Sequence, residues 1–153
     1  MIEIVRESRI DAPVEAVWKI VSDPDLAPDW FTFAERLEIR SGQGVGQLRT
    51  QHGRWGSKRS EVDQEITHFE PNRLLAWRHV AERLDGKPAP KFAASTEFRI
   101  ELEPDGAATT VRLRSRQEPA STVKGWVMKA FGTKEITRNL DRSLDQLAEV
   151  LRA

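Results

Sequence analysis

Two hydrophobic periods divide the sequence: alternation at every second residue over most of its length, and a three-to-four-residue period near its end. From about Thr133 onward the second period predicts a helix with a single apolar stripe. The stripe consists of Ile136, Leu140, Leu144, Leu147, Ala148 and Leu151. Such a stripe must be buried against another element. The alternating segments upstream predict that element, a curved antiparallel sheet wrapped around the terminal helix.

The segment from Pro119 to Phe131 also has a helical period, but its apolar sector is rotated by about a quarter turn from that of the terminal helix. Because Gly132 lies where the phase changes, we predict a kink or brief break there and a flap-like first segment. The two segments would still share one face, formed by Trp126, Ala130, Thr133 and Thr137. Because only Trp126 is large, this face would leave room beneath the indole ring, unless Trp126 simply fills the core.

The N-terminal part of the chain predicts a strand followed by two small helices. Residues 2–10 alternate between apolar and polar, with Arg6 on the apolar side. Pro13 opens the first helix, which stops at Asp23 and Pro24. The second helix, of one or two turns, ends near Trp30.

From Phe33 the two-residue period predicts six further strands. Asp105-Gly106 predicts a two-residue hairpin turn, whose register would place Thr96 opposite Ser115. The segment Asp85–Lys91 is the most loop-like in the chain. The strand at 74–81 is apolar on both faces, so its orientation stays open. Its bulkier inner set would be Leu75, Trp77 and His79.

The element order is thus β-α-α-β6-α, an α+β fold with a sheet of about seven strands in one domain spanning 1–153. Lys plus Arg and Asp plus Glu both number 24, so charge favours neither nucleic acid nor an anionic membrane as partner. The sequence has no cysteine and no run long enough for a membrane span or signal core. We therefore expect a soluble cytoplasmic protein, monomeric or weakly dimeric.

Several motifs resemble the START-like, or SRPBCC, superfamily with its helix-grip fold, and within it the polyketide cyclase/dehydrase and lipid-transport group. They are the run from Ile10 to Trp18 continuing into Ser22-Asp23-Pro24, then Trp30, the turn with Gly42, Gly44 and Gly46, and Glu70-Pro71-Asn72-Arg73. The resemblance covers the whole chain. It implies a deep cavity between sheet and terminal helix, with its mouth near the first part of that helix, and a ligand that is a hydrophobic or aromatic small molecule.

Catalytic and metal motifs are missing from the sequence. The histidines His52, His68 and His79 have no neighbours at metal-ligand spacing, so we predict neither a metal nor another cofactor. No serine lies in a nucleophile-elbow pattern. The glycine-rich run 42–46 joins two strands and opens no helix, which favours a hairpin turn over a phosphate site.

What remains is an apolar pocket with a few polar groups, the usual composition of a small-molecule site. Arg6 would either turn outward or, if buried, need a carboxylate partner from the protein or the ligand. Core packing is the alternative for many of the aromatic side chains. The candidate lining is Phe92, Ala94, Thr96, Phe98, Ser115, Trp126 and Ala130, followed by Trp77, His79, His52 and Arg6.

Three functions fit this description. The first is binding or transport of a hydrophobic or aromatic small molecule. The second is a polyketide cyclase, aromatase or dehydratase, in which His79, His52 or Arg6 would serve as acid-base or oxyanion partner. The third is a protein-interaction module resembling co-chaperone activators. The sequence leaves open whether the protein is an enzyme.

Overall fold

The structure is a computed structural model that describes residues 1–90, 93–127 and 132–153. It is an α+β fold in which strands dominate and the longest helix comes last. The elements are β1 (Ile2–Ile10), α1 (Val14–Val21), the 3-10 helix η1 (Pro24–Leu26), α2 (Ala27–Trp30), β2 (Arg36–Ser41), β3 (Leu48–Trp55), β4 (Lys58–Glu70), β5 (Leu74–Leu84), β6 (Lys87–Pro88), β7 (Ala93–Asp105), β8 (Ala108–Pro119), α3 (Thr122–Val127) and α4 (Thr133–Arg152).

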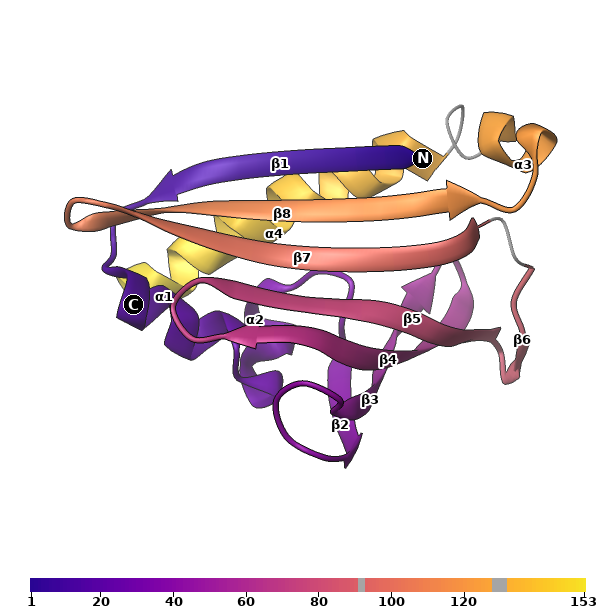
Figure 1. Ribbon diagram of the computed structural model, residues 1–153, viewed down its shortest axis with the longest axis horizontal. Helices are drawn as coiled ribbons and strands as arrows, with labels where there is room; N and C mark the ends of the chain where they lie inside the picture. The colour runs from indigo at the N-terminus through magenta and orange to yellow at the C-terminus, as the bar shows by residue number, and fades with distance from the viewer. Residues whose placement is uncertain (91–92, 128–131) are drawn as a thin grey trace.

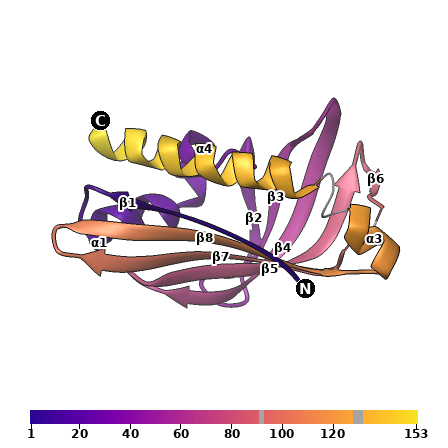
Figure 2. The same cartoon turned by 90° about the horizontal axis from the view of Figure 1, so that it is seen from above.

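The strands form one antiparallel sheet in the order β1-β8-β7-β5-β4-β3-β2, with β6 paired to β5 beside this path. The sheet curves, and α4 runs along its concave face from the N-terminal end of β1 towards α1 and α2 (Figures 1 and 2). The predicted helix-grip arrangement is therefore confirmed. None of the described helices has the length and apolar character that crossing a bilayer requires.

Local sequence explains why α1 and η1 form at one end of the grip. Pro13 lies at the N-cap position of α1, Glu15 occupies its first turn, and Val17 and Val21 are buried. The side chain of Asp23 then caps η1 by accepting a hydrogen bond from the backbone N–H of Asp25 at 2.9 Å.

The chain after α2 is fastened to the terminal helix. The Thr32 backbone N–H donates to Ser143 Oγ at 3.0 Å. The Thr32 hydroxyl lies 3.1 Å from the backbone oxygen of Asn139. α1, α2 and α4 thus cover the same end of the sheet, where most of the core lies.

The core combines one stripe of α4 with the inward residues of β7 and β8. From the predicted stripe, Leu140, Leu144 and Leu147 are buried, while Ile136, Ala148 and Leu151 pack at its margin. Four aromatic rings pack between helices and sheet: Phe31 contacts Phe33, Trp77 and Phe98, and Trp77 stacks on Phe98 with 4.9 Å between ring centroids. This end of the concave face is therefore filled by side chains.

The predicted hairpin between β7 and β8 is confirmed, but its register is shifted. Asp105 pairs with Ala108, so the turn residues are Gly106 and Ala107, and Phe98 rather than Thr96 lies opposite Ser115. Gly106 has a φ of +63°, a conformation that glycine adopts without steric cost and that suits the first central position of a tight turn. Because the shift is two residues, every side chain keeps its predicted face.

Other boundaries also differ from those expected. β8 continues through Pro119, so the first helical segment begins three residues later, at Thr122. The second begins at Thr133, directly after Gly132 as predicted, and the residues joining the two lie outside the described part. The loop-like segment after β5 turns at Asp85-Gly86, both with positive φ, and pairs back as β6.

Candidate functional site

The strand register arranges the inward side chains of the concave face in rows across the sheet. One row is mainly apolar and lies beneath the packed helices. It consists of Ile4, Ser115, Phe98, Trp77 and Ile66. Phe98, Trp77 and Ile66 are buried in the core, and Ser115 is the one polar member.

The next row, towards α3, is polar. Gln117 lies between Ile2 and Thr96, and Gln64 lies between His79 and Arg49. The last residue pair between β5 and β7 is Arg78 with Glu97. His79 and Thr96 are the next residues on these neighbouring strands, so they lie in the same row. The concave face therefore changes from apolar to polar along its length, and the polar row ends at a cation. The row is Gln117, Thr96, His79, Gln64 and Arg49.

Arg49 is the most unusual member of this row because it is a buried charge. The residue is 5% exposed, its Nε donates to Gln64 Oε1 at 2.9 Å, and its guanidinium carbon lies 4.5 Å from the centre of the Trp77 ring. Burial lowers the pKa of Arg49 to about 10. Among the described residues no carboxylate forms an ion pair with it.

Glutamine side chains fix the position of this guanidinium. Gln64 is fully buried, and its amide nitrogen donates to Gln51 Oε1 at 3.1 Å. This bond leaves Gln64 Oε1 free to face Arg49. The Arg49 Nε thus has a preorganised acceptor, whereas its terminal amino groups have no hydrogen-bond partner in the described part of the chain.

A small cavity lies beside Arg49, between η1, α2 and the inner face of β3. Its volume is about 10 Å³, room for about one water. Trp30 also lines it, and the buried indole N–H of Trp30 has no acceptor among the described residues. The remaining lining is Val21, Asp23, Pro24, Ala27, Phe31, Leu37, Gln51, Leu75, Trp77 and Ile100.

A larger hollow lies at the opposite end of the grip, beside α3. It is an open groove of about 520 Å³ between the start of β1, the end of β8 and α3. This volume is in the range of small-molecule sites. Its lining is Met1, Ile2, Pro119, Ser121, Thr122, Gly125 and Trp126.

The predicted lining residues that the structure describes are buried, half-buried or exposed. Phe98, Trp77 and Ser115 are buried on the concave face, and Thr96 and His79 are half-buried on its polar row. For the strand at 74–81, which had no predicted orientation, Leu75 and Trp77 face the core. Phe92 and Ala130 lie outside the described residues.

Three predicted lining residues are exposed, namely Ala94, Trp126 and Arg6. Ala94 leaves the inward alternation because the pairing of β7 with β8 shifts between Ala93 and Ser95. Trp126 is 77% exposed and lines the outer groove instead of covering the sheet, because β8 carries α3 beyond the sheet's end.

Arg6, whose orientation the sequence left open, and His52 both have protein carboxylates as partners. Arg6 is exposed, and its Nε forms an ion pair with Asp141 of α4 at 2.7 Å, so a protein carboxylate satisfies it. His52 belongs to the convex face, where its Nε2 lies 2.9 Å from Glu38 Oε1. The inward residues of β3 are Arg49 and Gln51, so the predicted lining residue His52 is one position out of phase with the inner face.

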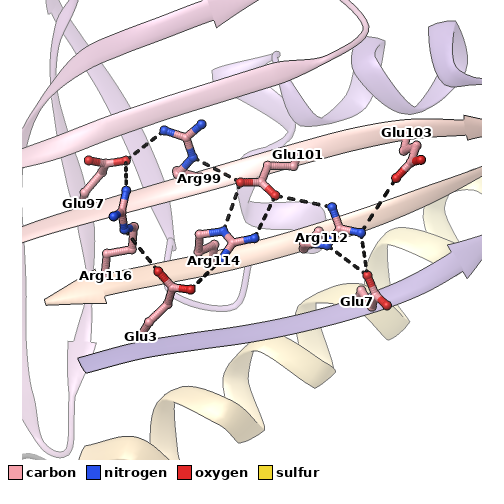
Figure 3. Close-up of polar contacts among 9 residues, drawn as sticks. All are labelled: Glu3, Glu7, Glu97, Arg99, Glu101, Glu103, Arg112, Arg114 and Arg116. Atoms are coloured by element: carbon pink, nitrogen blue, oxygen red, sulfur yellow. Dashed lines mark hydrogen bonds and ion pairs between the residues drawn. The ribbon is translucent and has the colours of Figure 1, made fainter. Parts of the chain in front are cut away.

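The most extensive cluster of titratable groups lies on the convex face of β1, β8 and β7 (Figure 3). At its centre, Glu101 accepts hydrogen bonds from Arg99 and Arg114 and lies 3.5 Å from Arg112. Each charged side chain in Figure 3 has a partner of opposite charge. This cluster is therefore a solvated ion-pair network with a structural role. The residues are Glu3, Glu7, Glu97, Arg99, Glu101, Glu103, Arg112, Arg114 and Arg116.

With this geometry established, comparisons with known proteins identify the family. The family model described as polyketide cyclase / dehydrase and lipid transport matches residues 1–152, and the chain belongs to this family. This agrees with the resemblance seen in the sequence. No curated protein matches the chain.

Solved structures share the fold. TTHA0849 from Thermus thermophilus is 18% identical with a TM-score of 0.75, covering 97% of this chain and 95% of that one. Ara h 8.0201 is 12% identical with a TM-score of 0.71, covering 97% and 96%. The Zhui aromatase/cyclase from Streptomyces sp. R1128 is 18% identical with a TM-score of 0.69, covering 97% and 92%. At these identities the similarity establishes the fold alone.

Proposed function

We propose that this protein binds a hydrophobic or aromatic small molecule between α3 and the polar row of the concave face. The family and the fold support this class of function, and the groove beside α3 is the observation that carries the location. The cavity at the other end of the grip is far smaller, since it holds about one water. The ligand therefore enters beside α3 and reaches the half-buried Thr96.

The lining chemistry fits a molecule that is mainly apolar. Ile2, Pro119 and Trp126 supply apolar surface to the groove, and Ser121 and Thr122 supply hydroxyl groups. Apolar walls with a few convergent polar groups are typical of sites that bind by burial and orient by hydrogen bonding. The expected cytoplasmic location stays a prediction.

Blocking the polar row tests the proposal. We expect 1-naphthol or 1-dodecanol to raise the melting temperature of the wild-type protein, and Thr96→Phe to weaken this response by about tenfold or more in ligand concentration because the ring fills the site. Thr110→Phe is the matched control, since Thr110 lies on the same sheet next to inward Thr109 and Val111 and so faces the other side.

One result would contradict this function, and another would contradict its location at the polar row. One is a wild-type melting temperature that stays constant across both probes. The other is an equal response from the two phenylalanine variants, which would place the ligand away from the polar row.

A cyclase, aromatase or dehydratase is the second candidate, favoured by the cation at the end of the row. A fixed guanidinium such as that of Arg49 stabilises the oxyanion that develops when a carbonyl compound loses a proton. Turnover of a polyketide-like substrate that is lost in Arg49→Met would favour this reading. Binding without turnover would favour the carrier function.

A further inference from the structure

Arg49 is a cation without a counter-charge in the described part of the structure. Four of its five N–H donors lack a protein partner there, although the residue is 5% exposed. A buried charge of this kind is costly unless an opposite charge or several hydrogen bonds compensate it. Arginines on the convex face, such as Arg83 with Asp63, have such partners.

The surroundings of Arg49 favour an acceptor rather than a second donor. The cavity beside it is also lined by Trp30, whose buried indole N–H lacks an acceptor among the described residues. Asp23 is the one carboxyl group of the lining, and its Oδ1 is engaged by the N–H of Asp25. Two residues with N–H groups that lack a protein acceptor in the described structure thus line a space of about one water.

We infer that Arg49 binds the acidic group of the ligand, so that the molecule taken up is an apolar carboxylic acid or a similar oxyanion. This inference rests on the proposed function and names its ligand class. One carboxylate oxygen matches the size of the cavity, and a carboxylate is the group that a guanidinium fork binds best.

The polar row gives the acid group its route. It leads from β8 to Arg49 on β3 through Thr96, His79 and Gln64. Four strand spacings of about 4.8 Å separate β8 from β3, which is about 19 Å along the sheet. A molecule that contacts both the groove and Arg49 is therefore extended, with its apolar part beside α3.

Matched acids and alcohols test the inference on the full-length protein. The probes are dodecanoate against 1-dodecanol and tetradecanoate against 1-tetradecanol, whose extended chains suit this span, with affinity measured by calorimetry at pH 7. We expect each acid to bind the wild type about tenfold or more tighter than its alcohol, because a hydrogen-bonded charge pair adds at least that much. Arg49→Met should abolish the difference by weakening the acid and not the alcohol.

Two further variants separate charge from fold. Arg49→Lys keeps the charge and should retain part of the preference for acids. Arg40→Met is the matched control, because Arg40 donates to Thr50 Oγ1 on the convex side and should leave the preference intact. Should Arg49→Met fail to fold, the ratio of acid to alcohol affinity in the wild type and in Arg49→Lys still decides the question.

The outcomes are distinct. Equal binding of acids and alcohols by the wild type would overturn the anionic ligand and leave the proposed function intact. An unchanged preference in Arg49→Met would overturn the role of Arg49. Binding of neither series would contradict the proposed function and the inference together. Binding of acetate as tightly as dodecanoate would support an anion site at Arg49 but contradict an apolar ligand.

Discussion

Single residues in this protein have roles set by the face of the sheet on which they lie. Arg49 and Thr50 are adjacent in β3, yet Arg49 faces the interior and Thr50 faces the convex side, where its hydroxyl donates to Asp63 at 2.8 Å. Alternation predicts that adjacent residues of a strand face opposite sides of the sheet, but it does not predict which of the two faces inward. Here polar residues at 49 to 52 gave no apolar signal to choose the phase.

Asp63 provides a pH-dependent prediction at the residue scale. Paired hydrogen bonds from Arg83, at 2.7 and 2.9 Å, outweigh its burial and, with the Thr50 hydroxyl, lower the pKa of Asp63 to about 2. The folded state therefore binds fewer protons than the unfolded chain. The resulting stabilisation is complete above the usual pKa of 3.8 and is lost as the pH falls towards 2.

We expect Asp63→Asn to lower the free energy of unfolding at pH 7 by about 1–2 kcal/mol, a value reduced for the partial exposure of the carboxylate. The difference from wild type should shrink between pH 4 and pH 2. Urea denaturation across this range measures it. Asp145→Asn on the exposed side of α4 is the control, and a difference that persists unchanged at pH 2 would refute the assignment.

At the scale of elements, the sequence predicted strands and helices well because each has a period that one chain segment displays by itself. The register of β7 with β8 was missed by two residues, since Asp105 and Gly106 suit either position of a tight turn. The start of α3 was missed because Pro119 fits the first turn of a helix as well as the end of β8, beyond Gln117, the last residue that pairs with β1.

The contact between β3 and the chain after α2 yields an element-scale prediction. A Cβ added to Gly53 would lie 2.4 Å from the backbone oxygen of Phe33, so this crossing requires glycine. Gly53→Ala should lower the free energy of unfolding by about 1–3 kcal/mol, the usual effect of overpacking. Gly132→Ala is the comparison, because a Cβ there meets nothing within 4 Å and Gly132 has helical φ and ψ.

Alanine at 132 should leave stability unchanged or raise it by up to about 1 kcal/mol, since it restricts the unfolded chain. Guanidinium denaturation of both variants gives the two values. Equal effects at the two positions would show that β3 and the Phe33 segment separate more easily than their contact suggests.

The whole molecule has an apolar interior and a convex surface laced with ion pairs, with 24 acidic and 24 basic residues in balance. Glu101 is central to this surface. Burial by itself would raise the pKa of Glu101, but hydrogen bonds from Arg114 and Arg99 together with their charges lower it. The network joins β1, β8 and β7, three strands drawn from both ends of the chain.

We expect the melting temperature to fall by about 2–4 °C when sodium chloride rises from about 0.05 to 1 M, because salt screens partly exposed pairs worth about 1 kcal/mol in sum. Glu101→Gln should lower the melting temperature in low salt and reduce this salt dependence. Thermal unfolding followed by circular dichroism measures both. An identical salt response in wild type and variant would contradict a stabilising network.

The sequence by itself determined the element order, the apolar stripe of α4 and the inward faces of β7 and β8, because these patterns are written in the spacing of neighbouring residues. Only the tertiary structure decided how full the grip is and which cation it encloses. Packing of Phe31, Trp77 and Phe98 joins three distant segments, and the enclosure of Arg49 depends on the phase of an all-polar stretch of β3. Those properties arise from contacts across the chain, which local periodicity does not contain.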